Sequence, residues 1–144
     1  MGSLDTTCFE EDLAAVHETE EAARWKITKT ADLEVTAAMS PKKALGESYH
    51  ARLRWHRYPG LPSLKFLDPA TGVQDNPRAW PQCGGFRPTT LDTCVMWTTE
   101  GHALHPEWAN APQTRFDPSG NALFRALNLL QHTLDYDYSG RFKG

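Results

Sequence analysis

The feature that most constrains the fold is a strict alternation of apolar and polar side chains over residues 49–56. The apolar positions are Tyr49, Ala51, Leu53 and Trp55, and the positions between them are His50, Arg52, Arg54 and His56. Successive side chains of a β-strand point to opposite faces, so this period of two predicts a strand with one apolar face and one basic face. Such a strand belongs to an antiparallel sheet that packs on one side and meets water on the other.

Neighbouring segments show strand patterns as well. Apolar and polar residues alternate over 25–28 and again over 32–39, and residues 63–67 form another short strand pattern. The connections are short, and the turn Tyr58-Pro-Gly-Leu-Pro62 is rich in residues that break regular structure. Consecutive strands joined by short turns predict an antiparallel meander of about four strands.

Helical patterns flank the meander. We expect residues 1–8 to be disordered and residues 9–24 to form an amphipathic helix, with acidic residues early and Arg24 at its end. A stronger helix is predicted over residues 121–135. The apolar stripe of that helix consists of Leu123, Leu127, Leu130 and Leu134, with Phe124 and Leu129 widening it.

Length and composition place these elements in one domain. The chain has 144 residues, 40% of them hydrophobic, which is enough for one core. Helices at the two ends, strands between them and a long irregular loop before the last helix predict an α+β fold over residues 9–144. The net charge of −3 does not favour a nucleic-acid partner. With no long apolar run and no signal-peptide pattern, we expect a cytoplasmic protein that does not bind membranes.

The long loop concentrates residues that can do chemistry. Between residues 86 and 108 it carries the thiol of Cys94 and the imidazoles of His102 and His105. Long irregular loops in compact domains are usually functional. The cysteines of the chain are too widely spaced to predict a disulfide framework, so we expect reduced thiols. Cys94 is therefore a candidate nucleophile, and either histidine could act as a base or an oxyanion donor.

The order of these features resembles that of the ubiquitin-conjugating enzyme family. An N-terminal helix and a meander are followed by the turn Tyr58-Pro59, by Leu64-Lys-Phe66 and by a Pro-rich loop. Cys94-Val95 and the helix containing Leu123–Leu134 come next. The resemblance covers residues 9–135 and depends on order and spacing more than on identities.

The resemblance implies a transferase. Cys94 would accept the C-terminus of a ubiquitin-like protein as a thioester from an activating enzyme and pass it to a lysine of a protein substrate. His102, His105 or Asp117 would assist the attacking amine, and no cofactor is implied. Asp117 is placed like the family's acidic residue that orients the acceptor lysine, although it could equally be a helix cap.

The sequence also departs from the family. The family carries His-Pro-Asn before its cysteine, whereas Phe86-Arg-Pro88 stands there and no Asn follows. The first helix, often basic in the family, is acidic. The chain is therefore similar to divergent, bacterial-type members, and its accessory chemistry cannot be carried over from the family.

Three alternatives remain open at this point. The missing Asn favours a catalytically inactive module of the same fold that binds a ubiquitin-like protein or a partner enzyme. Cys83, followed by Gly84 and Gly85, is a rival nucleophile. Zinc is a weaker option, because Cys83, Cys94, His102 and His105 lack the close cysteine pair of most structural zinc sites.

Overall fold

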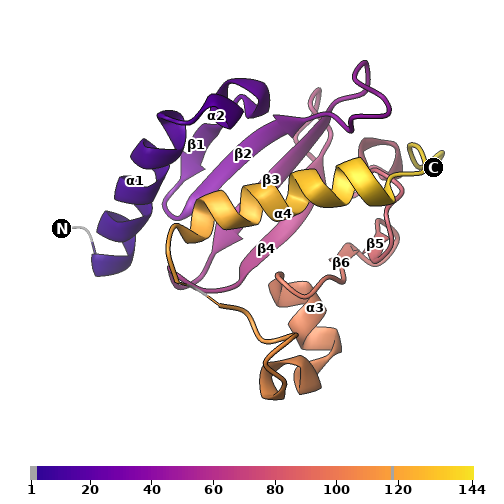
Figure 1. The fold of residues 1–144 in the computed structure, drawn as a ribbon. Coiled ribbons are helices and arrows are strands. Elements are labelled where there is room, and N and C mark those ends of the chain that lie inside the picture. The colour runs from indigo at the N-terminus through magenta and orange to yellow at the C-terminus, as the bar shows by residue number, and fades with distance from the viewer. Residues whose placement is uncertain (1–2, 118) are drawn as a thin grey trace.

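The computed structural model describes residues 3–117 and 119–144, which form a mixed α+β fold (Figure 1). Two helices open the chain, and four strands follow. A small hairpin, a short helix and a long C-terminal helix complete it. The helices are α1 (Leu4–His17), α2 (Glu20–Trp25), α3 (Thr99–Leu104) and α4 (Ala122–Asp137), with short 3₁₀ turns at η1 (Pro77–Ala79) and η2 (Pro106–Asn110). The strands are β1 (Thr28–Ala31), β2 (Glu34–Met39), β3 (Tyr49–Trp55), β4 (Pro62–Leu67), β5 (Phe86–Arg87) and β6 (Asp92–Thr93).

The main sheet is the predicted antiparallel meander, with strand order β1-β2-β3-β4. Its register aligns Val35 with Leu53 and Leu53 with Leu64 across three neighbouring strands. Side chains directly opposite one another lie on the same face, so this register collects the apolar positions on one side. The alternation in residues 49–55 is confirmed, because all four apolar positions of β3 are buried and the three between them are more exposed.

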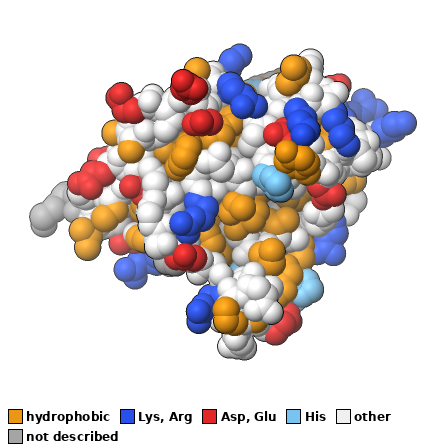
Figure 2. Space-filling view, viewed as in Figure 1, with side chains coloured by type: hydrophobic (Ala, Val, Ile, Leu, Met, Phe, Trp, Pro, Cys, Tyr) orange, Lys and Arg blue, Asp and Glu red, His pale blue; other side chains and the backbone are white. Residues whose placement is uncertain are grey.

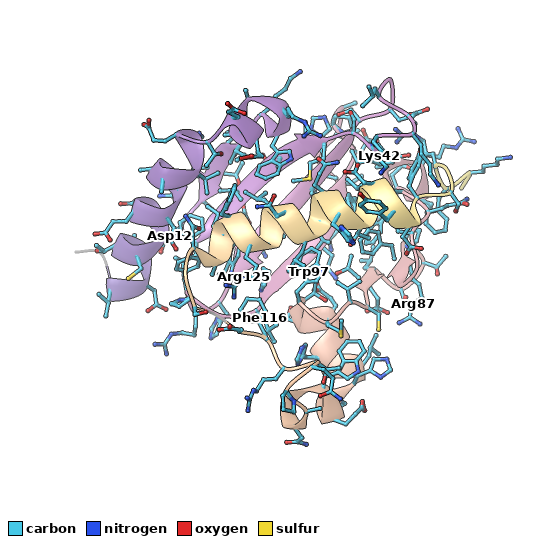
Figure 3. The ribbon with its side chains drawn as sticks, viewed as in Figure 1. Asp12, Lys42, Arg87, Trp97, Phe116 and Arg125 are labelled. Atoms are coloured by element: carbon cyan, nitrogen blue, oxygen red, sulfur yellow. The ribbon has the colours of Figure 1, made fainter. Side chains whose placement is uncertain are left out.

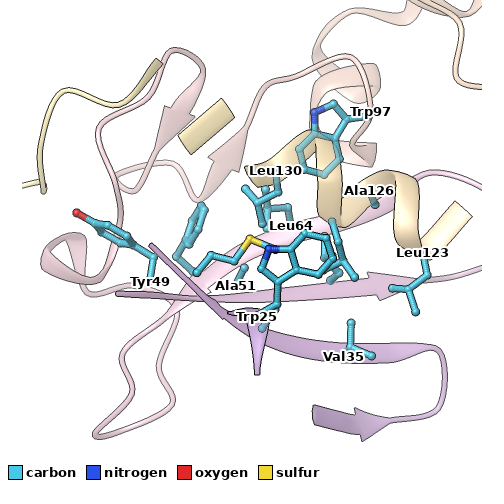
Figure 4. Packing of buried hydrophobic residues seen from close by; sticks show 14 of the residues in the cluster. Trp25, Val35, Tyr49, Ala51, Leu64, Trp97, Leu123, Ala126 and Leu130 are labelled. Carbon is cyan, nitrogen blue, oxygen red and sulfur yellow. The ribbon is translucent and has the colours of Figure 1, made fainter. Parts of the chain in front are cut away.

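Helix α4 lies across the apolar face of the sheet, and α1 and α2 lie beside it near β1 and β2 (Figure 1). The leucine stripe predicted from the sequence is fully buried against the sheet. Figure 4 shows Leu130 of α4 over Leu64 of the sheet, with Trp25 closing the layer from α2. Trp25 also donates from Nε1 to the buried Gln131 side chain of α4 at 3.0 Å, so the polar edge of the indole is satisfied inside the core.

The N-terminal helix begins earlier and ends sooner than the sequence predicted. Residues 4–8, expected to be disordered, belong to α1, because the Ser3 side chain caps the helix by accepting from Thr6 N–H at 3.1 Å. The predicted continuous helix over 9–24 is divided between α1 and α2 after His17. Residues 1 and 2, also expected to be disordered, lie outside the described residues.

The strand predicted over residues 25–28 is wrong except at its last residue. Trp25 ends α2, and the strand begins only at Thr28. A helix and a strand both leave Trp25 on a buried side, so the pattern in so short a run could not separate them.

Tyr58 joins three parts of the fold. Its hydroxyl donates to the Asp12 carboxylate of α1 and accepts from the Leu123 N–H at the start of α4 at 3.0 Å. Its ring packs edge-on against Phe9 of α1, with ring centres 5.2 Å apart. The Tyr58-Pro59 turn thus holds the first turn of α4 against α1, and α4 in turn fixes one wall of the site described below.

The coarse prediction is therefore confirmed: an α+β fold with an N-terminal helix, a four-stranded antiparallel sheet and a C-terminal helix. Among the described residues, no helix is both long enough and apolar enough to cross a membrane.

Candidate functional site

Cys94 follows β6, the second strand of the small hairpin. Its N–H donates to the Gly85 carbonyl at 2.7 Å, just beyond the pairing of Phe86 with Thr93. Gly85 has a φ of 86°, and a Cβ there would lie 2.4 Å from the Cys94 carbonyl oxygen. Only glycine tolerates both conditions, so Gly85 allows the backbone of the cysteine to close against the loop.

The hairpin is fastened to the main sheet through Thr93. This buried threonine donates its hydroxyl to the Leu64 carbonyl of β4 at 2.9 Å. Its own carbonyl accepts from the Thr98 hydroxyl at 2.5 Å, and Thr98 caps α3 by accepting from Gly101 N–H at 3.0 Å. A chain of side-chain hydrogen bonds therefore positions Cys94 between the sheet edge and α3.

Helix α3, which the sequence did not predict, packs on the edge of the sheet. Glu100 accepts from the Ser63 hydroxyl at 2.5 Å and pairs with Lys65 of β4 at 3.0 Å. The side chains of this pair are only 16% and 10% exposed, for Lys65 and Glu100 respectively. Gly101 lies so close to the backbone of Val95 that a Cβ would be 2.0 Å from the Val95 carbonyl oxygen. Together these contacts hold α3 against β4 and against Val95, the residue that follows Cys94.

The Cys94 side chain is partly exposed and borders an open pocket of about 340 Å³. The pocket has a floor from α4 and a rim from the loop, and most of its surface is apolar. Its lining consists of Cys94, Val95, Met96, Trp97, Trp108, Leu129, His132 and Thr133. A water molecule occupies ~30 Å³ of liquid, so the pocket can admit a short stretch of extended chain next to the sulfur.

His102 and His105 lie near this pocket but do not line it. His102 donates from Nε2 to the Met96 carbonyl at 2.7 Å, and its ring meets Trp108 edge-on at 5.6 Å. His105 stacks on Trp108 with ring centres 4.3 Å apart and places Nδ1 3.4 Å from Glu107. Both imidazoles therefore support Trp108, which forms part of the pocket wall.

Asp117 lies further along the same side of α4. Its carboxylate accepts from Ser119 N–H at 2.9 Å and lies 3.9 Å from Arg125. The Ser119 hydrogen bonds, followed by the charge of Arg125, hold the pKa of Asp117 below its ordinary value, so this exposed carboxylate is an anion at neutral pH. Asp117 does not cap α4, because the Asn121 side chain does so by accepting from Phe124 N–H at 2.9 Å.

Cys83, the rival nucleophile, is buried and points toward the backbone of α4. Its Sγ lies 4.0 Å from the Thr133 carbonyl. Burial, with a smaller contribution from Asp137, raises the pKa of the Cys83 thiol to about 12. A thiol that is both covered and protonated at neutral pH is a poor nucleophile. Of these two cysteines, only Cys94 borders the pocket.

The Cys94 pocket continues into two neighbouring hollows. One of these runs along the outer face of α4 past Phe124, and the other includes Asp117 and Phe116; all three share Leu129. Figure 3 shows Trp97, Phe116 and Arg125 where α4 faces the 94–117 segment, and Figure 2 shows hydrophobic side chains gathered in this region. We call the combined depression the α4 groove. It leads from Asp117 and Arg125 at one end to Cys94 at the other.

His132 is the residue that sequence reasoning missed. It lies on α4, exposed, and lines the pocket together with Cys94. The sequence carried one signal. Phe124 and Leu129 widened the apolar stripe beyond what the core needs, and both are only partly buried because they line the groove. An outer helix face with apolar residues beside a histidine indicates a surface that can bind something.

Within the described residues, no three histidine, cysteine or acidic side chains are close enough to hold a metal ion. The four ligands weighed for zinc are therefore not assembled into such a site.

Comparisons of the chain with protein-family models, with curated proteins and with solved structures give no match.

Proposed function

We propose that this protein carries an acyl group as a thioester on Cys94 and transfers it to an amine, as ubiquitin-conjugating enzymes do. The acyl donor would be the C-terminus of a ubiquitin-like protein, delivered by an activating enzyme, and the acceptor would be a lysine of a protein substrate. The proposal includes a fold related to that family, supported by the order of helix, meander, Tyr58-Pro59 turn, cysteine loop and long helix.

The placement of the sulfur is the observation that carries the proposal. Thioester chemistry needs a sulfur that a carboxyl terminus and then an amine can both reach. Cys94 borders an open apolar pocket at the end of a groove, and the groove can hold an extended tail leading to the sulfur. Cys83, buried with a raised pKa, fails both requirements.

The groove also suits the second substrate. Asp117 lines the far hollow together with Arg115 and Arg125, so its carboxylate would take the ammonium group of an incoming lysine in exchange for Arg125. Asp117 and Cys94 border different hollows, so this carboxylate would guide the amine and would not touch the sulfur.

The proposal can be tested without knowing the partners. A synthetic peptide that ends in Gly-Gly, activated as a 2-mercaptoethanesulfonate thioester, is incubated with the protein, and mass spectrometry follows peptide transfer to each cysteine. Cys8 is a matched control, because it is also partly exposed and borders no groove hollow. We expect Cys94 to load at least about tenfold faster than Cys8, because the pocket holds the peptide near the sulfur.

The adduct should be released by reductant, disappear in Cys94→Ala and persist in Cys83→Ala. Loading of Cys94 no faster than Cys8 would overturn the proposal and favour the inactive binding module. Once a ubiquitin-like protein, its activating enzyme and ATP are in hand, the same variants should give the same order.

A further inference from the structure

We infer that His132 is the general base that removes the proton from the attacking amine when the Cys94 thioester is transferred. This inference rests on the proposed function and names a catalytic residue for its second half. The thioester forms without His132, and the imidazole acts only when an amine attacks.

The observation behind it is the pocket itself. Besides the thiol of Cys94, His132 is the only titratable side chain among the residues that line this pocket. The rest of the lining is apolar apart from Thr133, whose hydroxyl donates to the Leu129 carbonyl of its own helix at 2.9 Å. An amine that reaches a thioester on Cys94 therefore meets one group able to accept its proton.

The other two histidines near the pocket, His102 and His105, already make contacts of their own. His102 donates a hydrogen bond from Nε2 to the Met96 carbonyl, and His105 is stacked on Trp108 with Nδ1 directed toward Glu107. His132 makes no side-chain hydrogen bond to the described residues, and its ring lies against that of Tyr136, with ring centres 4.5 Å apart. Its ring nitrogens are thus available to a substrate, and the tyrosine one helical turn away limits how the ring can rotate.

The transfer step needs only the amine, the thioester on Cys94 and the imidazole of His132. The neutral amine attacks the thioester carbonyl carbon, and its nitrogen loses a proton to His132. The carbon–sulfur bond breaks, Cys94 leaves as a thiolate, and the imidazolium returns the proton to that sulfur or to water. The product is an amide, and both side chains recover their starting state.

The charged and titratable groups around the imidazole come from every element packed on this side. On α4 the neighbours are Tyr136 and Arg125, which lines the same hollow as His132, and Lys42 lies over the Tyr136 ring at 3.9 Å. Across the pocket is Cys94, and behind Trp108 are His105 and Glu107. The imidazole packs directly against no carboxylate in this set, so proton uptake from an amine depends on the imidazole itself.

The test separates loading from transfer. Wild type and His132→Ala are first loaded on Cys94 with the Gly-Gly peptide thioester, and the loaded forms are then given free L-lysine. We expect equal loading but about a hundredfold slower discharge to lysine in His132→Ala, within the usual contribution of general base catalysis. His17→Gln, at an exposed histidine in the last turn of α1 that lines none of the three hollows, is the matched control and should discharge within about twofold of wild type.

Two further readouts exclude a merely structural effect. Added imidazole should restore part of the lysine discharge of His132→Ala. Hydroxylamine, which is largely unprotonated at neutral pH, should show a much smaller defect.

Discharge to lysine by His132→Ala that stays within about twofold of wild type would overturn the inference. So would an equal loss toward lysine and hydroxylamine without rescue by imidazole. Either result leaves the proposed function standing if Cys94 still loads, whereas absence of loading in wild type removes the proposed function itself.

Discussion

Two regions of the molecule are held together in different ways. The layered body consists of α1, α2, the main sheet and α4, and most of its leucines and aromatic rings are buried in one core. The segment 94–117 contributes one buried hydrophobic side chain, Trp97, and is attached through the Thr98 hydroxyl, which donates to the Thr93 carbonyl, and through the Glu100–Lys65 pair. Packing builds the body, whereas capping, close backbone contact and a half-hidden ion pair build the segment.

The difference explains where the reactive groups lie. Burial raises the pKa of Cys83, which packs into the core of the body, and denies it access, so that thiol is inert. A segment attached by polar contacts at the sheet edge can present Cys94 to solvent without opening the core. Helix α4 of the body also faces the segment (Figure 1). Its inner face fills the core, and its outer face forms the floor of the α4 groove.

The two faces of α4 give the largest expected contrast. Leu130→Ala removes a fully buried side chain, and we expect the free energy of unfolding to fall by about 3 kcal/mol. The adjacent Leu129→Ala, on the partly exposed groove face, should cost only about 1 kcal/mol, because less area returns to water. Urea denaturation measures both. Equal losses would mean that the groove face is part of the core.

The two cysteines give the next contrast. With a pKa of about 12, the Cys83 thiolate fraction at about pH 8 is on the order of 10⁻⁴, and burial slows its reaction further. We expect iodoacetamide to modify Cys94 at least about a hundredfold faster than Cys83 in the native protein. Peptide mapping at intervals gives the two rates.

The sign of the pH effect is set by the raised pKa. Because the thiolate is the reacting form, alkylation of Cys83 should rise about tenfold per pH unit up to about pH 12. In denaturant the burial disappears, and the two cysteines should then react at similar rates. Similar rates in the native protein at about pH 8 would place Cys83 at the surface, contrary to the contrast.

Gly101→Ala tests how closely α3 is held against Val95 within the segment. The added Cβ would meet the Val95 carbonyl at 2.0 Å, so α3 must move away, at a cost of about 2 kcal/mol. Hydrogen exchange should show about thirtyfold lower protection in α3, while the amides of α4 keep theirs. Gly46→Ala is the control, because a Cβ there meets nothing within 4 Å.

If Gly101→Ala instead lowered protection throughout α4 and the sheet, the segment would be cooperative with the body. The two regions would then unfold as one unit, and the proposed contrast between a packed body and a polar-attached segment would be wrong.

Much of the body followed from the sequence, because periodicity reports burial directly. The alternation in β3 and the leucine stripe of α4 each placed the apolar residues on the face that the structure buries. Errors arose where the pattern was short. Trp25 fits a helix or a strand equally well, and the early start of α1 depends on a cap at Ser3 that carries little weight without the contacts made by the helix.

The site was less accessible from the sequence. Cys94 was singled out by its loop, but His102 and His105 were chosen because they are close in the chain, and the structure turns both toward Trp108. His132 is distant in sequence from Cys94, and only the packing of α4 on the sheet brings it to the same pocket.

What the sequence determined by itself was the set of elements and their inward faces, because burial of alternating or helically spaced apolar residues is a local pattern repeated along the chain. What only the tertiary structure decided was which chemical groups share a pocket. That depends on how α3 and α4 pack against the sheet edge, where contacts such as Thr93 with Leu64 and Glu100 with Lys65 join residues far apart in the chain.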